Sequence, residues 1–263
     1  MTYAETDLVA TIERLAGKDL AALTQPQRDQ LDQFHSGGAE AVDRLLPSLD
    51  VAPGMTVLDI GSGLGGPARQ IARSSGCTVV GVDLTPAYVD TARALTHTEG
   101  LDDQVTFVCS DIAALDRFDF DAAYTMHVQM NVAEKKTYFT EIARRLRPGA
   151  HFATFEVCLT GRTQPTPPLP WSLDGTDSYL ATAAELRDTI ASSGFEILEW
   201  VDETQWVLQW FENLGKRMAA GGSPATLPAL LNDGPTRMMN FAVALTTGVV
   251  SVHRGSFILA TVS

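Results

Sequence analysis

Short apolar runs alternate with longer amphipathic stretches between residue 55 and about residue 160. Short runs rich in β-branched residues are typical of buried strands, whereas the longer stretches have helical spacing. This alternation predicts βαβ units and a mostly parallel sheet with helices on both faces. The expected strands are Thr56–Ile60, Thr78–Asp83, Val105–Cys109, Ala122–Thr125 and His151–Val157, and the expected helices are Pro67–Ser74, Pro86–Glu99 and Glu134–Leu146, the last ended by a turn at Arg147–Gly149.

The pattern changes on either side of this block. The first 50 residues predict two or three helices, one of them beginning at Pro26. The stretch from Thr160 to Asp177 is rich in proline and predicts a loop. It is followed by a helix (Ala181–Ser193), a strand (Glu196–Val201), a mainly helical stretch from Trp206 to Thr247 with breaks at Gly221–Pro224 and Asp233–Pro235, and a last strand (Val249–Val262). We therefore expect an N-terminal helical cap over residues 1–50 and an α/β domain over residues 51–263, with lid segments at 159–180 and 203–247.

The composition and the net charge of the chain disfavour several classes of function. With 45% hydrophobic and 19% charged residues in a chain of 263, the composition is that of an ordinary globular protein. The net charge of −13 disfavours nucleic acids and anionic membrane surfaces as partners. Three widely separated cysteines give neither a disulfide framework nor a clustered zinc site, so no metal is expected. Neither a signal peptide nor a membrane-spanning run is recognisable, which predicts a cytoplasmic protein; a homodimer remains open.

A glycine-rich segment carries the first chemical signal. Val57–Arg69 reads as a strand, a glycine-rich turn and a helix, and it contains the G-x-G-x-x-G pattern of dinucleotide sites. That pattern alone is a weak indication. Asp59 stands two residues before the first glycine, where a buried negative charge would not help to bind a pyrophosphate. An acid at this place instead suits a cationic ligand.

Two further predicted strands also end in a carboxylate. Asp83 ends the strand Thr78–Asp83, from where it could accept hydrogen bonds from both hydroxyls of a ribose. Asp111 follows Val105–Cys109 and could accept from an adenine amine. Because the carboxyl ends of parallel strands meet at one sheet edge, the three acids predict a site for a phosphate-free, positively charged nucleoside. S-adenosylmethionine is such a ligand.

These motifs resemble class I S-adenosylmethionine-dependent methyltransferases of small molecules, similar to the ubiquinone/menaquinone-biosynthesis and sarcosine/dimethylglycine methyltransferases. The resemblance is carried by residues 34–38, 57–66, 79–93, 109–112, 126–132 and 143–149. It implies S-adenosylmethionine as the cofactor and a Rossmann-like, seven-stranded, mostly parallel sheet of order 3-2-1-4-5-7-6. It also implies N-terminal helices and a helical cap inserted before the last strand. One departure is Ala150, where these relatives usually have a second glycine, and it should cost little.

The resemblance also implies which residues meet the cofactor. Asp83 would take the ribose, Asp111 and Ile112 the adenine, and Asp59 would organise the glycine turn. The remaining residues that the resemblance assigns to the cofactor site are Phe34, His35, Gly37, Gly38, Gly61, Ser62, Gly63, Gly65, Leu84 and Met126.

Acceptor residues are expected after the fourth and fifth strands. His127 is the candidate catalytic base or acceptor ligand, although it could equally be a packing histidine. Gln129 and Asn131 could orient a polar acceptor, while Asn131 could instead cap a helix beginning at Ala133. Glu156 could contact an amine or hydroxyl, or it could be a surface carboxylate.

Aromatic residues gather in the predicted lids. Trp171 and Tyr179 accompany the proline-rich loop, and Trp206 and Trp210 share one face of a helix. Such residues either pack in the core or line an acceptor pocket, where they could hold a cation.

Several functions therefore remain open. The leading prediction is methyl transfer to oxygen or nitrogen of a small-molecule metabolite by in-line displacement in a lidded pocket. The alternatives are a C-methyltransferase of a natural-product or quinone-type substrate, an NAD-dependent oxidoreductase, and a non-catalytic cofactor-binding protein.

Overall fold

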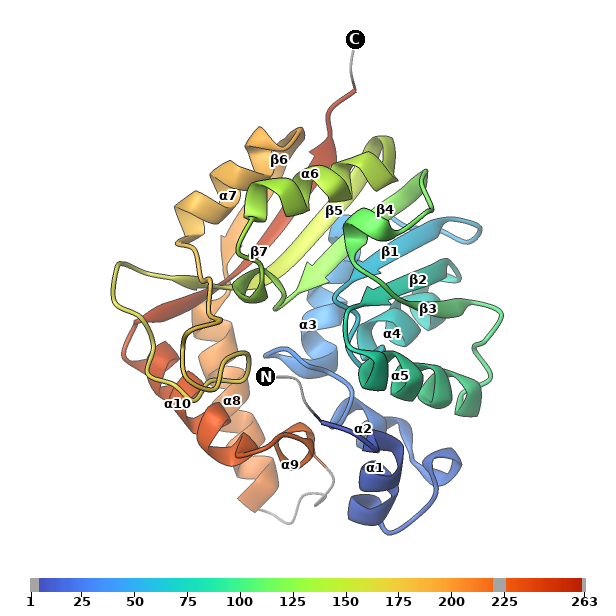
Figure 1. The fold of residues 1–263 in the computed structure, drawn as a ribbon, viewed down its shortest axis with the longest axis vertical. Helices are drawn as coiled ribbons and strands as arrows, with labels where there is room; N and C mark the ends of the chain where they lie inside the picture. The colour runs from blue at the N-terminus through green and yellow to red at the C-terminus, as the bar shows by residue number, and fades with distance from the viewer. Residues whose placement is uncertain (1–4, 220–225, 262–263) are drawn as a thin grey trace.

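A computed structural model describes residues 5–219 and 226–261. Its centre is a seven-stranded sheet of order β3-β2-β1-β4-β5-β7-β6 (Figure 1), as predicted. The strands are β1 (Thr56–Ile60), β2 (Thr78–Asp83), β3 (Val105–Cys109), β4 (Phe120–Met126), β5 (Leu146–Leu159), β6 (Phe195–Asp202) and β7 (Val250–Leu259). Only β7 runs antiparallel to its neighbours β5 and β6, whereas the other pairings are parallel.

Helices cover both faces of this sheet. They are α1 (Leu8–Ala16), α2 (Gln25–Asp29), α3 (Gly38–Leu45), α4 (Gly66–Ser75), α5 (Pro86–Thr98), α6 (Lys135–Arg145), α7 (Ala183–Ser192), α8 (Thr204–Ala219), α9 (Leu227–Leu230) and α10 (Gly234–Thr246). Because side chains alternate along a strand, neighbouring residues enter different layers. Val57 packs in the cluster that includes α3, α4, α5 and α8, and Leu58 packs in the cluster that includes α6 and α7.

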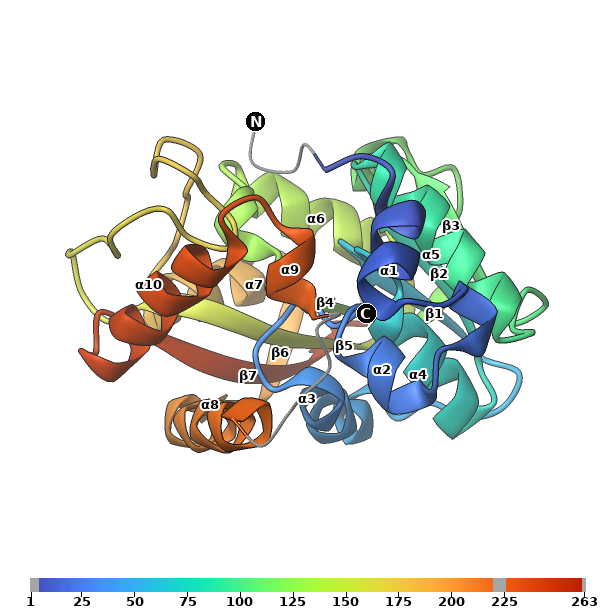
Figure 2. The same ribbon diagram turned by 90° about the horizontal axis from the view of Figure 1, so that it is seen from below.

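Two groups of helices lie beyond the edge where the parallel strands end. In Figure 1 the N-terminal helices and α8–α10 both lie below the carboxyl ends of β1 and β4. Figure 2 shows α9 beside α1, and a small cluster that includes Leu8, Tyr88 and Leu230 joins α1, α5 and α9. Segments distant in sequence therefore meet over the sheet edge at which a ligand is expected.

The structure corrects several predicted boundaries. Helix α6 begins at Lys135 with Glu134 as its N-cap, so Asn131 does not cap a helix beginning at Ala133. The predicted turn at Arg147–Gly149 does not separate α6 from the next strand, because β5 begins directly at Leu146. The turn is instead an irregularity within β5, where the pairing with β4 shifts and Gly149 has a φ of +78°. Glycine tolerates this left-handed conformation, which accommodates the extra residues. The predicted break at Gly221–Pro224 lies outside the described residues, and so does Val262.

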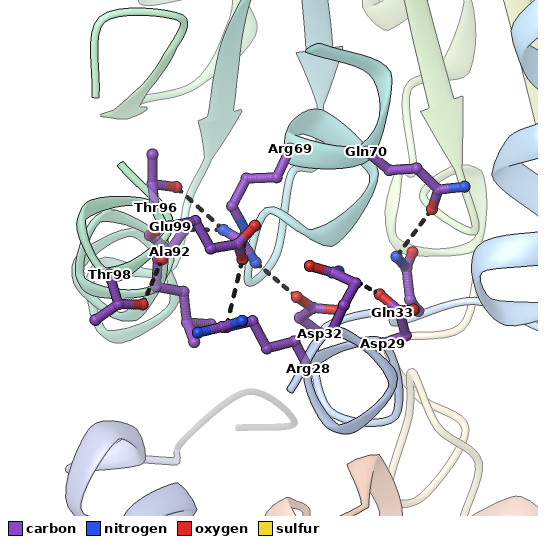
Figure 3. A network of polar contacts seen from close by, with 12 residues as sticks. Arg28, Asp29, Asp32, Gln33, Arg69, Gln70, Ala92, Thr96, Thr98 and Glu99 are labelled. Carbon is purple, nitrogen blue, oxygen red and sulfur yellow. Dashed lines mark hydrogen bonds and ion pairs between the residues drawn. The ribbon is translucent and has the colours of Figure 1, made fainter. Parts of the chain in front are cut away.

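A buried ion-pair network joins the N-terminal segment to the first βαβ unit. Arg69 on α4 is 1% exposed and lies 2.7 Å from Asp32 and 3.0 Å from Glu99 (Figure 3). Its guanidinium also donates to the Thr96 hydroxyl. Burial raises the pKa of Asp32 to about 6, although Arg69 opposes the shift. One side chain thus holds the loop before α3 against α4 and α5.

No helix of the described residues has the length and hydropathy that crossing a bilayer requires.

Candidate active site

A cavity of about 630 Å³ lies at the carboxyl ends of β1, β2 and β4. Its wall includes the loop Phe34–Ser36, the proline-rich loop after β5, and residues of α9 and α10. Small-molecule sites commonly have volumes of about 300–1,000 Å³ and form at this edge of a parallel sheet. The cavity is therefore the candidate active site.

Two carboxylates face one end of this cavity. Asp83 Oδ2 accepts a hydrogen bond from the Gly63 amide at 2.9 Å, and its Oδ1 accepts one from the Thr85 amide at 2.9 Å. Asp111 Oδ1 accepts from the Ala113 amide at 2.7 Å. Both acids line the cavity. Because each carboxylate oxygen can accept two hydrogen bonds, both acids can still bind hydroxyl or amine donors of a ligand.

Four backbone amides of the glycine turn donate hydrogen bonds within the protein. The amides of Gly61 and Ser62 donate to the Val82 carbonyl, and the amide of Gly65 donates to the Ser62 carbonyl. The Gly63 amide is used by Asp83. Phosphate-binding turns need free amides, and these four are not free.

The start of α4 is likewise unsuited to a phosphate. A Cβ on Gly66 would lie 2.6 Å from both the carbonyl oxygen and the Oδ1 of Asp32. The acid Asp32 therefore covers this helix N-terminus, where an anionic ligand would bind. Together with the committed turn amides, this removes the main support for a dinucleotide site.

Asp59 departs from the predicted arrangement of three acids around a common cleft. It lies inside β1, is 3% exposed and does not line the cavity. Burial is the main cause that raises the pKa of Asp59 to about 7, and the nearby Asp83 charge adds to it. The reason for the departure is that Asp59 precedes the strand end by one residue, whereas Asp83 and Asp111 stand at or just beyond their strand ends.

His127 lines the cavity directly after β4. Its backbone is left-handed, with a φ of +57°, and its amide donates to the Phe155 carbonyl at 2.9 Å. The ring stacks on that of Phe155 with centroids 5.9 Å apart, and Nε2 lies 3.1 Å from the Ser36 hydroxyl. Burial lowers the pKa of His127 well below its usual value, and His35 adds to the shift. The imidazole is therefore neutral near pH 7 and can accept a proton.

His35 also lines the cavity, but both of its ring nitrogens have partners. Nδ1 lies 3.2 Å from the Ser36 carbonyl oxygen and Nε2 lies 3.0 Å from Gln33 Oε1. Burial lowers the pKa of His35 to about 4. These contacts stabilise the loop that brings Ser36 to His127.

Glu156 and Gln129 lie behind His127 rather than at the cavity. Glu156 is fully buried, and its Oε2 accepts from the amides of Val128 at 2.9 Å and Gln129 at 3.2 Å. The Gln129 side chain donates to the Val157 carbonyl. Burial raises the pKa of Glu156 to about 7. Both side chains hold the loop that carries His127, so their place does not match the predicted contact with an acceptor.

Trp206 and Trp210 likewise lie outside the cavity. A Cβ on Gly37 would lie 2.6 Å from the Trp206 ring, and one on Gly38 would lie 3.2 Å from the Trp210 ring. The Arg44 guanidinium lies 4.6 Å from the centroid of Trp206. The two glycines thus let α8 approach α3, and the tryptophans pack there instead of lining an acceptor pocket.

The cavity brings together most of the predicted site residues. Those that line it are Phe34, His35, Gly61, Gly63, Asp83, Leu84, Asp111, Ile112, Met126, His127, Asn131, Trp171 and Tyr179. Those that lie outside its lining are Gly37, Gly38, Asp59, Ser62, Gly65, Gln129, Glu156, Trp206 and Trp210.

Sequence reasoning missed part of the lining, including Ser36, Tyr88, Met130, Leu227, Leu231, Met238 and Phe241. Ser36 could have been found, since it lies between His35 and Gly37 in a quoted motif. The residues of α9 and α10 belong to no motif, and only the tertiary fold brings them to the site. Among the described residues, no group of three or more His, Cys, Asp or Glu side chains is arranged to hold a metal ion.

Comparison with known proteins gives a family match for part of the chain. Residues 57–149 match a family model described as a methyltransferase domain. The chain is 34% identical to the sterol 24-C-methyltransferase of Yarrowia lipolytica over 131 residues, which are 49% of this chain and 34% of that protein. It is 32% identical to methyltransferase GfsG of Streptomyces halstedii over 138 residues, 52% of this chain and 50% of that protein. The matches thus span a third to a half of these relatives.

Solved structures share the fold at lower identity. A geranyl diphosphate C-methyltransferase from Streptomyces coelicolor A3(2) in complex with S-adenosyl-L-homocysteine has a TM-score of 0.68 at 18% identity, over 84% of this chain and 80% of that one. The [4+2]-cyclase SpnF has a TM-score of 0.69 at 20% identity, over 97% and 94% of the two chains. These similarities show the fold alone.

Proposed function

We propose that this chain is a class I S-adenosylmethionine-dependent methyltransferase that transfers the methyl group of S-adenosylmethionine to a small-molecule acceptor. The match of residues 57–149 to a methyltransferase domain supports this proposal. The accepting atom is oxygen, nitrogen or carbon. The sequence favours oxygen or nitrogen, whereas the sterol 24-C-methyltransferases among the relatives support carbon equally.

One observation carries this proposal. Asp83 and Asp111 present hydrogen-bond acceptors to the cavity, while the amides of Gly61, Ser62, Gly63 and Gly65 in the glycine turn already donate within the protein. The site therefore suits a ligand that donates hydrogen bonds and has no phosphate. We assign the ribose to Asp83, the adenine to Asp111 and Ile112, and the methionine part to Gly61, Gly63 and Met126, although Gly65 lies outside the cavity lining.

The protein's own residues would align the acceptor and exclude water. S-adenosylmethionine supplies a methyl group on a sulfonium, which is transferred by in-line displacement without a protein nucleophile. His127 removes a proton from an acceptor that must lose one, and Ser36 orients the imidazole through Nε2. The lid residues Trp171 and Phe241 keep water from the reacting atoms.

Calorimetric titration with S-adenosylhomocysteine tests the cofactor assignment. Asp83→Ala should weaken binding by about thirtyfold or more, because hydrogen bonds to a charged group contribute about 1.5–3 kcal/mol each. Asp90→Ala is the matched control, since Asp90 is an exposed acid of α5 outside this cavity. Equal affinity of Asp83→Ala and the parent would mean that the ribose assignment is wrong.

A second experiment separates catalysis from cofactor binding alone. The shared fold with the cyclase SpnF means that the fold does not by itself fix methyl transfer. Enzyme loaded with methyl-labelled S-adenosylmethionine should transfer label to a metabolite extract in a single turnover. Cofactor binding without transfer would support the non-catalytic alternative, and quenching of protein fluorescence by NADH would support the oxidoreductase.

We also propose a cytoplasmic location without nucleic-acid or membrane partners. Cys77, Cys109 and Cys158 are free thiols, which suits a reducing compartment. The net charge of −13 opposes binding to polyanions.

A further inference from the structure

The cavity has two chemically different ends. One end holds the acids Asp83 and Asp111. The other is formed by apolar side chains from η4 (Gln129–Asn131), the proline-rich loop and α10: Met130, Trp171, Met238 and Phe241. Met130, Trp171 and Phe241 belong to one core cluster. The His127 ring lies 6.0 Å from that of Phe241, so the imidazole borders this apolar end.

The cavity lining contains no lysine or arginine among the residues that the structure describes. The segments 1–4, 220–225 and 262–263, which it does not describe, contain neither residue type in the sequence. Glu134 and Asp177 are acidic members of the lining. A negatively charged acceptor would therefore find no cationic side chain in the wall.

Two cationic side chains that are adjacent in sequence to lining residues, Arg237 and Lys135, already make hydrogen bonds within the protein. Arg237 on α10 is fully buried, and its guanidinium donates to the carbonyls of Leu169 at 2.9 Å, Asn232 at 3.3 Å and Pro170. It also lies 3.8 Å from Glu5. These contacts fix the proline-rich loop to α10. Because the Arg237 guanidinium is buried and bound to these carbonyls, it does not serve as a partner for a ligand in the cavity.

Lys135 is used in the same way. Its ammonium donates to the Val132 carbonyl at 2.7 Å and to the Tyr179 carbonyl, which ties the end of the proline-rich loop to the start of α6.

Since burial also lowers the pKa values of His35 and His127, neither imidazole carries a positive charge at neutral pH. An anionic acceptor would thus lose its hydration without gaining a counter-charge from the protein, which is costly in an apolar site.

We propose that the acceptor carries no negative charge and has a large apolar body with a hydrogen-bonding group at its reacting end. The apolar body packs against Trp171, Met238 and Phe241, and the reacting end meets His127 and Ser36. Apolar burial of roughly 25 cal/mol per Å² supplies most of its affinity. This inference rests on the proposed function, because it reserves the acidic end of the cavity for the cofactor.

Three probes with the same ten-carbon body test the charge preference: geraniol, geranyl diphosphate and protonated geranylamine. Each is titrated by calorimetry into the full-length protein saturated with S-adenosylhomocysteine. We expect geraniol and geranylamine each to bind about tenfold or more tightly than geranyl diphosphate, because burying a negative charge without a cationic partner opposes binding. The longer alcohols farnesol and geranylgeraniol extend the series to larger apolar bodies.

The proposal is overturned if the diphosphate binds as tightly as geraniol or geranylamine, or if none of the three alcohols binds. A separate titration of the unliganded protein with S-adenosylhomocysteine keeps the two proposals distinguishable. Loss of cofactor binding contradicts the proposed function, whereas cofactor binding with the wrong charge preference contradicts this inference alone.

A pair of neighbouring variants places the charge preference in the cavity. Met238→Lys introduces a cation into the apolar end, while Met239→Lys introduces the same charge on an exposed side chain of the same helix. Met238→Lys should weaken geraniol binding and strengthen diphosphate binding, each by about tenfold. Met239→Lys should bind all three probes as the parent does. Equal behaviour of the two variants would contradict the proposal, and the melting temperature of each shows whether it is folded.

Discussion

His127 meets several constraints at once. It adopts a left-handed backbone, which is uncommon for residues other than glycine, although histidine, asparagine and aspartate adopt it more often than the rest. Glu156 contributes to holding it there, because its carboxylate accepts from the two amides that follow His127. Strain of this kind persists where surrounding contacts impose it and is frequent at functional sites. The arrangement supports a catalytic role more than a packing role.

Replacement of His127 by alanine tests that role. The variant should bind S-adenosylhomocysteine as the parent does, since no cofactor contact is assigned to the imidazole. Transfer of labelled methyl in a single turnover should fall about 10²–10⁴-fold if the acceptor must lose a proton. His97→Ala is the control, because the His97 side chain is 81% exposed on α5. Unchanged transfer in His127→Ala would reduce His127 to a packing residue.

Asp59 makes a pH-dependent contribution to stability. Its pKa is raised from 3.8 to about 7 by burial in β1, so the folded state holds a proton that the unfolded state has lost between these values. This contribution is present below pH 4 and is lost as the pH rises through 7. Urea unfolding at pH 5 and pH 8 should show that Asp59→Asn gains about 2–3 kcal/mol relative to the parent over this range. A pH-independent difference would mean that Asp59 ionises normally.

At the scale of elements, Arg69 joins three segments through charge. The short helix α2 and the loop after it contribute Arg28 and Asp32, and Glu99 follows α5. Arg69 on α4 compensates both buried carboxylates (Figure 3). Such a network is costly to bury but more costly to break, because one missing partner leaves charges without compensation.

Arg69→Met should therefore destabilise the protein by about 3–5 kcal/mol in urea unfolding. Arg187→Met is the control, since Arg187 is 41% exposed in an ion pair with Asp188 and exposed pairs contribute about 0–1 kcal/mol. A loss of the same size in both variants would contradict a special role of the buried network.

Local periodicity in the sequence predicted the bounds of three strands correctly. The strands Thr56–Ile60, Thr78–Asp83 and Val105–Cys109 occur with the predicted bounds. Their apolar runs end in turn signals, so sequence alone marks both ends. The bounds at Arg147–Gly149 failed because a proline and a glycine signal a turn equally well between elements and within an irregular strand.

At the scale of the whole molecule, the N-terminal segment shares the main core. Ala41, Val42 and Leu45 of α3 and Leu49 shortly after it are at most 1% exposed, in the same cluster as Val57 of β1. Burial of a valine or leucine side chain contributes about 1.5–3 kcal/mol, whereas whole domains are stable by only about 5–15 kcal/mol. The residues before the sheet therefore add a large share of the total stability.

A shortened chain of residues 51–263 should consequently lack a cooperative unfolding transition in urea, whereas the full chain should unfold in one step. Near-ultraviolet circular dichroism monitors whether tertiary packing is retained. A cooperative transition in the shortened chain would mean that residues 1–50 are a separable cap.

The sequence by itself determined the sheet, its strand ends and the place of Asp83 and Asp111 at the candidate site, because these depend on short-range periodicity and on residues that lie within a few positions of a strand end. Tertiary structure alone decided that Asp59 is buried below the cavity and that Trp206 and Trp210 pack on α3. It also decided the acceptor end, since Met238 and Phe241 reach the cavity only through the packing of α10 against distant segments. Burial and charge compensation depend on such long-range contacts, which no local pattern encodes.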